Sequence, residues 1–545
     1  MKRSLPVLIG SGFCVMGLAL SPVYAANLMQ VYQQALKSDP IYAQAVSTWH
    51  SQKMNFPIAR AGYLPQLSLT GNASRQYQRI NSTFAPNFSG STGTGGTSIG
   101  NGNGSSWLYG YNLTATQQVF NYAVWEQMKN ASFTVKAATA TFLSAQQSLM
   151  QRTATAYFAV LKAYDQLRYT VANKRAVWQQ FVTAREQFRV GLIAITDEYD
   201  ARARYDQVVA LEIANLNNLN IQLENLRAIT DHFYGSLKGL GKLPLLSPQP
   251  NNINTWVSIS DKQNYSIQAQ NFTVLAAMEN IKQQAAAAYP SLGLTSSVGE
   301  QHVTDISPSA TQDTANLGLQ LTYNPIQGGL VNATTEQARY NYVTASGLLE
   351  QTHRTVVNQA RSSFLSILSD ISRVKADKAT ITSTQNAFDA TEAGLKVGTR
   401  TMVDVLNSLT SLYQAQQQYA NDQYSYINDL INLKLAAGTL SETDLQEINS
   451  WLGKSIHFPS QMSVATVPAE NSHKELGIDT GPNIGSAYTS TAFEKNKQKT
   501  VNSNDTATKP APKQPLQVPP TDASTAAPPI PAPVFNTPIP APAHT

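Results

Sequence analysis

Two stretches of this chain, about two hundred residues apart, carry the same short motif between long segments without turn-forming residues. Residues 190–197 read Val-Gly-Leu-Ile-Ala-Ile-Thr-Asp, and residues 397–404 read Val-Gly-Thr-Arg-Thr-Met-Val-Asp. Gly191 and Gly398 stand where a glycine ends one helix and lets the chain reverse into the next. Two matching helical hairpins indicate an internal duplication, which favours an extended scaffold or conduit over an enzyme built around one pocket.

The segments before the two motifs predict unusually long helices. Residues 124 to 190 contain neither Pro nor Gly, and residues 331 to 397 contain only Gly347 and Gly394. At 1.5 Å per residue, either segment would reach roughly 100 Å. Ala, Gln, Ser, Thr and Asn dominate both segments. Such a composition is typical of helices that pack closely while a second face stays in water.

Each half of the chain also contains a pair of alternating strands. The best-defined runs are Trp107, Tyr109, Tyr111, Leu113 against Leu108, Gly110, Asn112, Thr114, and Leu317, Leu319, Leu321, Tyr323 against Gly318, Gln320, Thr322. We expect about ten residues per strand, the length that crosses a bilayer when tilted. Aromatic residues at one end suit a lipid-facing surface, and one face of a soluble sandwich is the alternative.

Four such strands cannot close a barrel alone. An unpaired strand edge in lipid would leave backbone groups that each cost several kcal/mol. Either the protein is not in a membrane, or several chains share one barrel. No later segment offers the eighteen or more apolar residues of a membrane-spanning helix.

The chain begins with the pattern of a cleaved export signal. Two basic residues precede a mostly apolar run over residues 5–20, and Val23-Tyr24-Ala25 supplies the small residues that a signal peptidase needs. We therefore expect residues 1–25 to be removed. The only cysteine, Cys14, lies in this segment, so the mature chain has no disulfide or thiol chemistry. The net charge of +5 is too slight to suggest a nucleic-acid partner.

The rest divides into three parts. Residues 26–245 form the first structural repeat, with helices, two strands and a helical hairpin, and residues 246–458 form the second, with two strands and a hairpin. Residues 459–545 are Pro-rich and cannot bury enough apolar surface to fold. We interpret them as a disordered tail, either simply solvated or a ligand for a proline-binding module.

Five segments together carry a family resemblance. They are Asn-Leu-Met-Gln-Val-Tyr-Gln-Gln-Ala at 27–35, Thr-Ala-Thr-Ala-Tyr-Phe at 153–158, Pro-Ile-Gln-Gly-Gly at 325–329, and the two motifs at 190–197 and 397–406. On these residues the chain resembles the TolC-type family of outer-membrane efflux proteins, from about residue 26 to residue 451.

The resemblance implies an α+β membrane protein in which three chains share a β-barrel of twelve strands, four from each. A long periplasmic α-helical barrel of coiled-coil hairpins would continue from it. The hairpin tips would close the far end, where a periplasmic adaptor and an inner-membrane transporter dock. The expected place is the outer membrane of a Gram-negative cell, in contact with its lipid. The expected function is an exit duct for tripartite efflux, type I secretion, or both.

The same resemblance implies a gate near the tips. An Arg after the second tip links, in the family, to a Thr-Asp pair on a neighbouring chain, which here means Arg400 with Thr196 and Asp197. An Arg fork can bond a carboxylate and a hydroxyl together. Helix capping is the alternative explanation for Thr196 and Asp197. It does not explain Arg400, because a cation at a helix N-terminus opposes the helix dipole.

Other gate positions depart from the family pattern. Asp404 is expected to face the lumen, but the family's second Asp, one turn on, is Asn407, and its Tyr before the second tip is Leu395. Whether Asp200 compensates for Asn407 stays open. The tips expected to contact the adaptor are Val190, Gly191, Leu192, Val397, Gly398 and Thr399.

Nothing in the sequence indicates catalysis. The seven histidines are scattered without metal-ligand spacing, and no nucleophile or paired-carboxylate pattern is recognisable. We therefore expect no catalytic residue, no metal and no cofactor. The alternative function, a coiled-coil structural or surface protein with a soluble sheet, would predict long strict heptads and no paired lipid-facing strands.

Overall fold

The computed structural model describes residues 25–80, 102–304 and 310–458, all within one compact unit. Most of the expected signal peptide and the whole Pro-rich tail lie outside these residues. The described elements fall into a four-stranded sheet, two long helical hairpins, a set of shorter helices, and a small second sheet.

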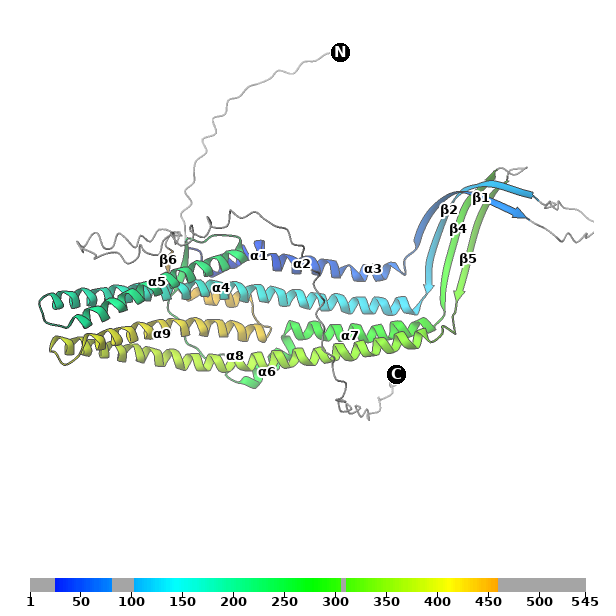
Figure 1. Ribbon diagram of the computed structural model, residues 1–545. Helices are drawn as coiled ribbons and strands as arrows, with labels where there is room; N and C mark the ends of the chain where they lie inside the picture. The colour runs from blue at the N-terminus through cyan, green and yellow to red at the C-terminus, as the bar shows by residue number, and fades with distance from the viewer. Residues whose placement is uncertain (1–24, 81–101, 305–309, 459–545) are drawn as a thin grey trace, which may run out of the picture. The chain divides into compact units, whose positions relative to one another are not determined.

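Two helical hairpins dominate the fold, and they have nearly equal dimensions. The first consists of α4 (Tyr122–Arg189) and α5 (Ile195–Thr230), and the second of α8 (Leu330–Lys396) and α9 (Met402–Ala436). Helices α4 and α8 begin within one or two residues of where the sequence placed them. Figure 1 shows both hairpins reversing at the same end of the unit, away from the strands.

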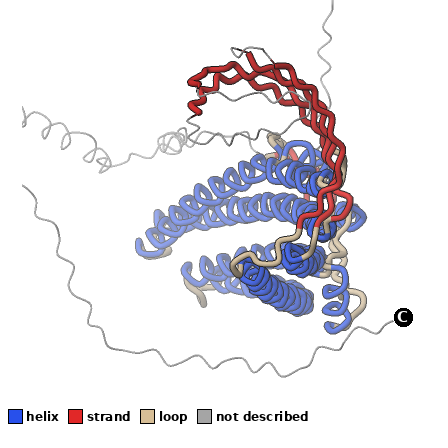
Figure 2. The backbone as a smooth tube through the Cα atoms, turned by 90° about the vertical axis from the view of Figure 1, so that its right-hand side faces the viewer, coloured by secondary structure: helices blue, strands red, loops and turns tan. Residues whose placement is uncertain are grey.

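The larger sheet is antiparallel throughout and has the order β1-β2-β4-β5. Its strands are β1 (Gln66–Ile80), β2 (Gly102–Phe120), β4 (Ser291–Thr304) and β5 (Ala310–Thr322). At 13 to 19 residues they are longer than the expected ten, because the ladder continues beyond the apolar rows toward the loops. Strand β2 leads into α4 through Asn121, whose side chain caps that helix. Figure 2 shows the sheet as a strongly curved layer.

Shorter helices pack against the two long ones. They are α1 (Leu28–Ser38), α2 (Pro40–Lys53), α3 (Asn55–Ala61), α6 (Ile253–Gln263), α7 (Tyr265–Ala285), the 3-10 turn η1 (Ala286–Ala288) and α10 (Glu442–Ser450). Asn27 caps α1 as predicted, in a capping box with Gln30. Asp39 caps α2, and its two carboxylate oxygens accept hydrogen bonds from Nη1 and Nη2 of Arg152 on α4, at 3.2 and 2.8 Å. Helices α2 and α3 are separated at Met54.

A small sheet joins the beginning, the middle and the end of the described chain. Strand β3 (Ser236–Leu240) pairs with β6 (Leu452–His457), and the main chain of Ala26 bonds to Ser236 and Lys238 on β3. Tyr157 of α4 donates its hydroxyl to the Lys238 carbonyl at 2.6 Å. This sheet could not be predicted from the sequence, because its strands are five and six residues long and lack clear alternation.

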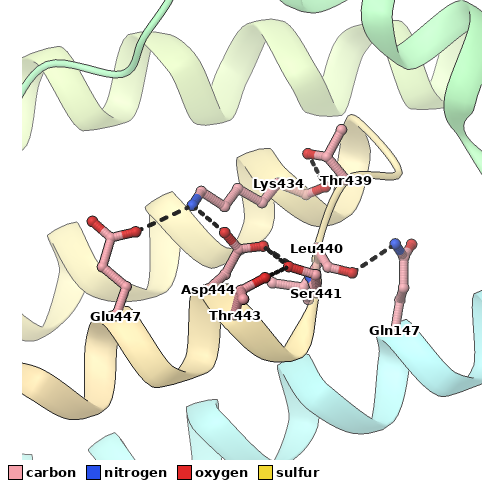
Figure 3. Close-up of polar contacts among 8 residues, drawn as sticks. All are labelled: Gln147, Lys434, Thr439, Leu440, Ser441, Thr443, Asp444 and Glu447. Carbon is pink, nitrogen blue, oxygen red and sulfur yellow. Dashed lines mark hydrogen bonds and ion pairs between the residues drawn. The ribbon is translucent and has the colours of Figure 1, made fainter.

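The turn after α9 ties the end of the second hairpin back to α4. Figure 3 shows Lys434 bonding Asp444 at 2.6 Å, while Gln147 donates to the Leu440 carbonyl at 2.9 Å. Gly438 has φ +71°, a backbone conformation that favours glycine. A Cβ at this position would in addition collide with the backbone at Gln263.

The core is divided along the hairpins. A large cluster surrounds the small sheet and includes the fully buried Tyr32, Tyr157, Phe158 and Tyr426. A smaller cluster lies near the tips, where Phe181 of α4 and Leu406 of α9 are buried together with neighbouring apolar side chains. Between these clusters, polar contacts replace apolar ones across the helix pairs.

Candidate functional site

The four-stranded sheet has two chemically different faces. Directly paired residues share a face, and the register places Leu69, Leu113 and Val298 in one row. The same face carries Leu67, Trp107, Tyr109, Tyr111, Leu292, Leu294, Leu317, Leu319 and Leu321. Many of these side chains are exposed in the single chain, including Leu67, Leu69, Leu317 and Leu321. Toward the loops the same face also carries Arg75, Glu300, His302 and Asp313, so it suits lipid in the half nearer the helices.

The opposite face is polar and uncharged. On it lie Ser68, Thr70, Asn72, Asn112, Thr114, Thr116, Thr295, Ser297, Gln301, Thr314, Asn316 and Gln320, with Leu108 and Val303 as apolar exceptions near the loops. Gly110 and Gly299 belong to this face, and a Cβ at either would lie 2.3 or 2.7 Å from a backbone oxygen of the adjacent strand. Glycine therefore allows the strands to curve toward the polar face, which suits the inner wall of a water-filled lumen.

The two tips share one turn geometry. At the first, Gly191 has φ +77°, and the N–H of Leu192 donates to the Gln187 carbonyl. At the second, Gly398 also has φ +77°, and the N–H of Thr399 donates to the Gly394 carbonyl. Nothing lies within 4 Å of a Cβ at either glycine, so the backbone conformation and not space selects glycine.

Apolar side chains surround these glycines in the open. Val190 and Leu192 are 70% and 73% exposed, and Val397 is 75% exposed. Exposed apolar residues at the ends of two adjacent hairpins form a surface of the kind that contacts another protein. They were among the residues expected to meet a partner, and no partner chain is present to test that expectation.

The capping interpretation of Thr196 is wrong. Helix α5 begins at Ile195, and its N-cap is Ala194, which has no side chain that could accept a hydrogen bond. Thr196 therefore lies inside the first turn and caps nothing. Asp197 and Glu198 do lie in that turn, where negative charge is favoured by the helix dipole.

The capping role lies instead at the second tip, with Asp404. Thr401 caps α9, accepting from the Asp404 N–H at 3.2 Å, while the Asp404 carboxylate accepts from the Thr401 N–H at 3.0 Å. These bonds lower the pKa of Asp404 below its usual value, with a smaller contribution from the charge of Arg400. Asp404 therefore stays ionised through the physiological range while it holds the first turn of α9.

Arg400 and Leu395 lie beside one another at the second tip. The Arg400 side chain packs over Gly394, where an added Cβ would lie 2.7 Å from its Cγ. Leu395 packs against the apolar cluster behind the tips. Within the part of the chain that the structure describes, no ion pair joins Arg400 to Asp197.

Asn407 takes part in a contact that the sequence did not indicate. Its side-chain oxygen accepts from Arg204 of α5 at 2.9 Å, and Arg204 also bonds Gln207 at 3.0 Å. This bond links the two hairpins one turn beyond Asp404. A comparison of the tips by sequence could not find it, because Arg204 has no counterpart at the matching place in the second hairpin. Asp200 makes no recorded contact among the described residues.

A groove runs between α4 and α8 just behind the tips. Its lining includes Trp178, Gln187, Leu395 and Lys396, and its volume is about 570 Å³. Apolar and polar groups alternate along it. Its position places it next to the exposed tip residues and on the outside of the apolar cluster.

Two further properties concern the described residues as a whole. Every helix in them is too short or too polar to serve as a membrane span. No three His, Cys, Asp or Glu side chains in the described ranges are grouped so as to hold a metal ion.

Solved structures show the class of protein to which this fold belongs. The Campylobacter jejuni CmeC outer membrane channel superposes with a TM-score of 0.64 at 16% identity, covering 83% of this chain and 98% of that one. The fold is thus that of outer-membrane efflux channels.

Relatives in sequence identify the family. Residues 31–232 and 256–439 match the outer membrane efflux protein family. Outer membrane protein TolC of Salmonella enteritidis is 36% identical over 501 residues, covering 89% of this chain and 95% of the relative. The alkaline protease secretion protein AprF of Pseudomonas aeruginosa is 25% identical over 427 residues, covering 78% and 86%. The chain belongs to the outer membrane efflux protein family, and its place is the outer membrane.

Proposed function

We propose that three copies of this chain form a continuous exit duct across the outer membrane and the periplasm. The duct serves tripartite efflux, type I secretion, or both, since the relatives include TolC and a protease secretion protein. Drugs or proteins enter it from an inner-membrane transporter through a periplasmic adaptor. The protein acts as a passage and not as an enzyme.

The sheet supports the shared barrel. Its order leaves β1 and β5 each paired on one side only within the described residues. In lipid those edges need partners, because each unpaired backbone group costs several kcal/mol. Three chains, each giving four strands, close one barrel of twelve. The apolar face then meets lipid, and the uncharged polar face lines the lumen.

The tips support a gate. In the trimer, Arg400 of one chain binds Thr196 and Asp197 of its neighbour, and the tips converge to close the helical barrel. Asp404 and Asn407 face the narrowed lumen, where the three Asp404 carboxylates attract cations. The adaptor binds the exposed tip residues and the groove behind them.

The two repeats, residues 26–245 and 246–458, each contribute one hairpin and half of the strands. Cleavage after Ala25 leaves Ala26 on the small sheet. The Pro-rich residues from 459 onward are not needed for transport. A chain ending after Phe458, which is buried and bonded to Gly235, keeps every described element.

The observation that carries this function is the two-faced sheet with unpaired edges, joined directly to 68- and 67-residue helices. The test is fractionation and pore formation. We expect the protein in the outer-membrane fraction as a heat-sensitive trimer on gels, with discrete conductance steps in planar bilayers. Recovery as a soluble monomer, or a membrane trimer without conductance, would contradict the proposal.

A further inference from the structure

Four aspartates form a row where the two helices of the second hairpin face each other. Asp370 and Asp377 lie seven residues apart on α8, and Asp422 and Asp429 lie seven apart on α9. Seven residues are two helical turns, or about 10 Å, so each helix presents both carboxylates on one side. Asp370 is 4% exposed and Asp422 is 3% exposed. Asp429 lies beside Asp370, and Asp422 beside Asp377.

Among the residues that the structure describes, Arg373 is the cation that pairs with this row. Arg373 lies between the pairs, 3.9 Å from Asp370 Oδ1 and 3.4 Å from Asp422 Oδ1. Gln418 donates to both oxygens of Asp422 at 3.0 Å. With all four carboxylates ionised, the row would hold three uncompensated negative charges in a largely buried contact, an arrangement that proteins normally avoid.

Two oxygens of the row have no hydrogen-bond donor. They are Oδ2 of Asp370 and Oδ2 of Asp377, both buried from solvent. Each belongs to a carboxyl group whose neighbour is another carboxyl group, and ionised carboxylates only accept hydrogen bonds. One proton per pair removes this conflict, because a protonated carboxyl donates to the ionised one.

Burial and the neighbouring carboxylates raise the pKa values of both aspartates on α8. Burial, with Asp429 next in importance, raises the pKa of Asp370 to about 6. Burial, with Asp422 next, raises the pKa of Asp377 to about 6. In both cases the charge of Arg373 acts in the opposite direction.

One carboxyl group on a neighbouring helix resembles the row, because burial raises the pKa of Asp165. On α4, which packs against α9, Asp165 pairs with Arg168 at 3.2 Å and accepts from the Tyr424 hydroxyl at 2.6 Å. Helix α6, which packs against α8, carries only Asp261 and Lys262, and Asp261 pairs with His353, more than four turns away from Asp370.

A second carboxyl pair shows what compensation looks like. Glu126 of α4 and Glu279 of α7 are also buried side by side, but each has its own lysine, Lys129 at 2.9 Å and Lys282 at 3.0 Å. Burial would raise the pKa of Glu126, yet the bonds from Lys129 and its other neighbours bring it below the usual value. The Oε2 atoms of that pair also lack a hydrogen-bond donor, but the pair has one lysine for each carboxyl group, whereas the aspartate row has one arginine among the described residues.

We propose that the aspartate row is a proton-binding site, in which Asp370–Asp429 and Asp377–Asp422 each hold one proton below neutral pH, and that the α8–α9 contact loosens when these protons leave. Because the pKa values are raised in the folded hairpin, it binds more protons than the separated helices do. The stabilisation is complete below pH 4 and is lost as the pH rises through about 6. The first hairpin has no such row among its described residues.

Hydrogen exchange of the full-length trimer at pH 5.5 and pH 8, corrected for the intrinsic rate, tests this proposal. Peptides of α5 are the internal reference, because α4 contacts α9 and carries Asp165. We expect protection of α8 and α9 near the row to fall by about tenfold or more relative to that reference, since each pKa unit is a factor of ten. Unchanged relative protection would overturn the proposal.

Variants separate the row from a general effect of pH. The double variant Asp370→Asn, Asp377→Asn places an amide N–H donor in each pair at every pH. The pH dependence of the protection of α8 and α9 should therefore disappear. Asp389→Asn is the matched control, because Asp389 is exposed on the same helix and bonds only Gln385. Arg373→Gln should move the transition upward by about one pH unit. A wild-type response in the double variant, or a downward move with Arg373→Gln, would also overturn the proposal.

Discussion

The two hairpins have almost the same frame but different chemistry between their helices. Helices of 68 and 36 residues form the first, and helices of 67 and 35 residues form the second, with glycines at φ +77° at both tips. In the first, Lys174 pairs with Glu212, and Asn215 donates to Thr170 at 2.8 Å. In the second, four carboxyl groups share one arginine. Duplication therefore preserved the geometry, while the response to charge and pH diverged.

The tips repeat this contrast on a smaller scale. The second begins α9 with a side-chain cap, whereas the first begins α5 with Ala194 and no cap. The first hairpin thus has paired polar contacts along its helices and no side-chain cap at its tip. The second has a capped tip, and its helix contact is the weaker one above neutral pH.

Arg400→Ala should have the largest effect, because it removes the proposed latch from all three chains at once. Each exposed pair contributes up to about 1 kcal/mol, so three copies acting together could shift the closed population by about a hundredfold. The readouts are resting conductance in bilayers and sensitivity to antibiotics too large for porins. Arg189→Ala is the control, since Arg189 precedes the first tip and pairs only with Glu186 within its own helix. Equal behaviour of the two variants would remove Arg400 from the gate.

Lys174→Met should loosen the first hairpin at every pH. It leaves Glu212 partly buried without its cation, which costs about 1–2 kcal/mol. Faster exchange of α5 amides, by the same factor at pH 5.5 and pH 8, is the expected result. Lys396→Met removes an exposed pair with Glu392 on the other hairpin and should leave the exchange of α5 amides unchanged. A strong pH dependence in the Lys174 variant would erase the proposed difference between the hairpins.

Thr401→Ala and Ala194→Ser should make the stabilities of the two tips more similar. Loss of the cap at Thr401 costs about 1 kcal/mol, and a new hydroxyl cap at residue 194 gains a similar amount. Exchange of the first-turn amides should speed up in α9 and slow down in α5. If Ala194→Ser slowed nothing, the turn before α5 would be unable to present a cap.

Asn407→Asp should have the smallest effect, despite adding a carboxylate to the proposed lumen. Arg204 already bonds residue 407 and would neutralise the new charge, so the cation-to-anion permeability ratio should change by a factor of about two at most. Combined with Arg204→Gln, the same substitution should raise the ratio further. A large rise in the single variant would show that Arg204 does not reach this position in the trimer. Asp404→Asn is preferable to Asp404→Ala in such measurements, because alanine would also remove the capping box.

The sequence predicted the large elements because their signals are long and repeated. Absence of Pro and Gly over whole helices, two Val-Gly tips and strict alternation in Trp107 to Leu113 each stand out from the background. The residue-level contacts could not be predicted in the same way. The bond between Arg204 and Asn407 spans two hairpins, and the aspartate row needs the register of α8 against α9 before its pairs become visible. Capping, the alternative explanation for Thr196, fails because α5 begins at Ile195 with Ala194 as its N-cap, and the sequence does not mark this boundary.

The small sheet has a consequence for the order in which the chain matures. It joins Ala26, the residues of β3 and the residues of β6, so its last strand lies some four hundred residues after its first partner. Contacts of such long separation form slowly and late, because the loop must close before the contact contributes any stability. An incompletely exported chain can form both helices of its first hairpin but lacks β6. The small sheet can therefore be completed only after β6 has been delivered, so its closure marks export of the described part of the chain.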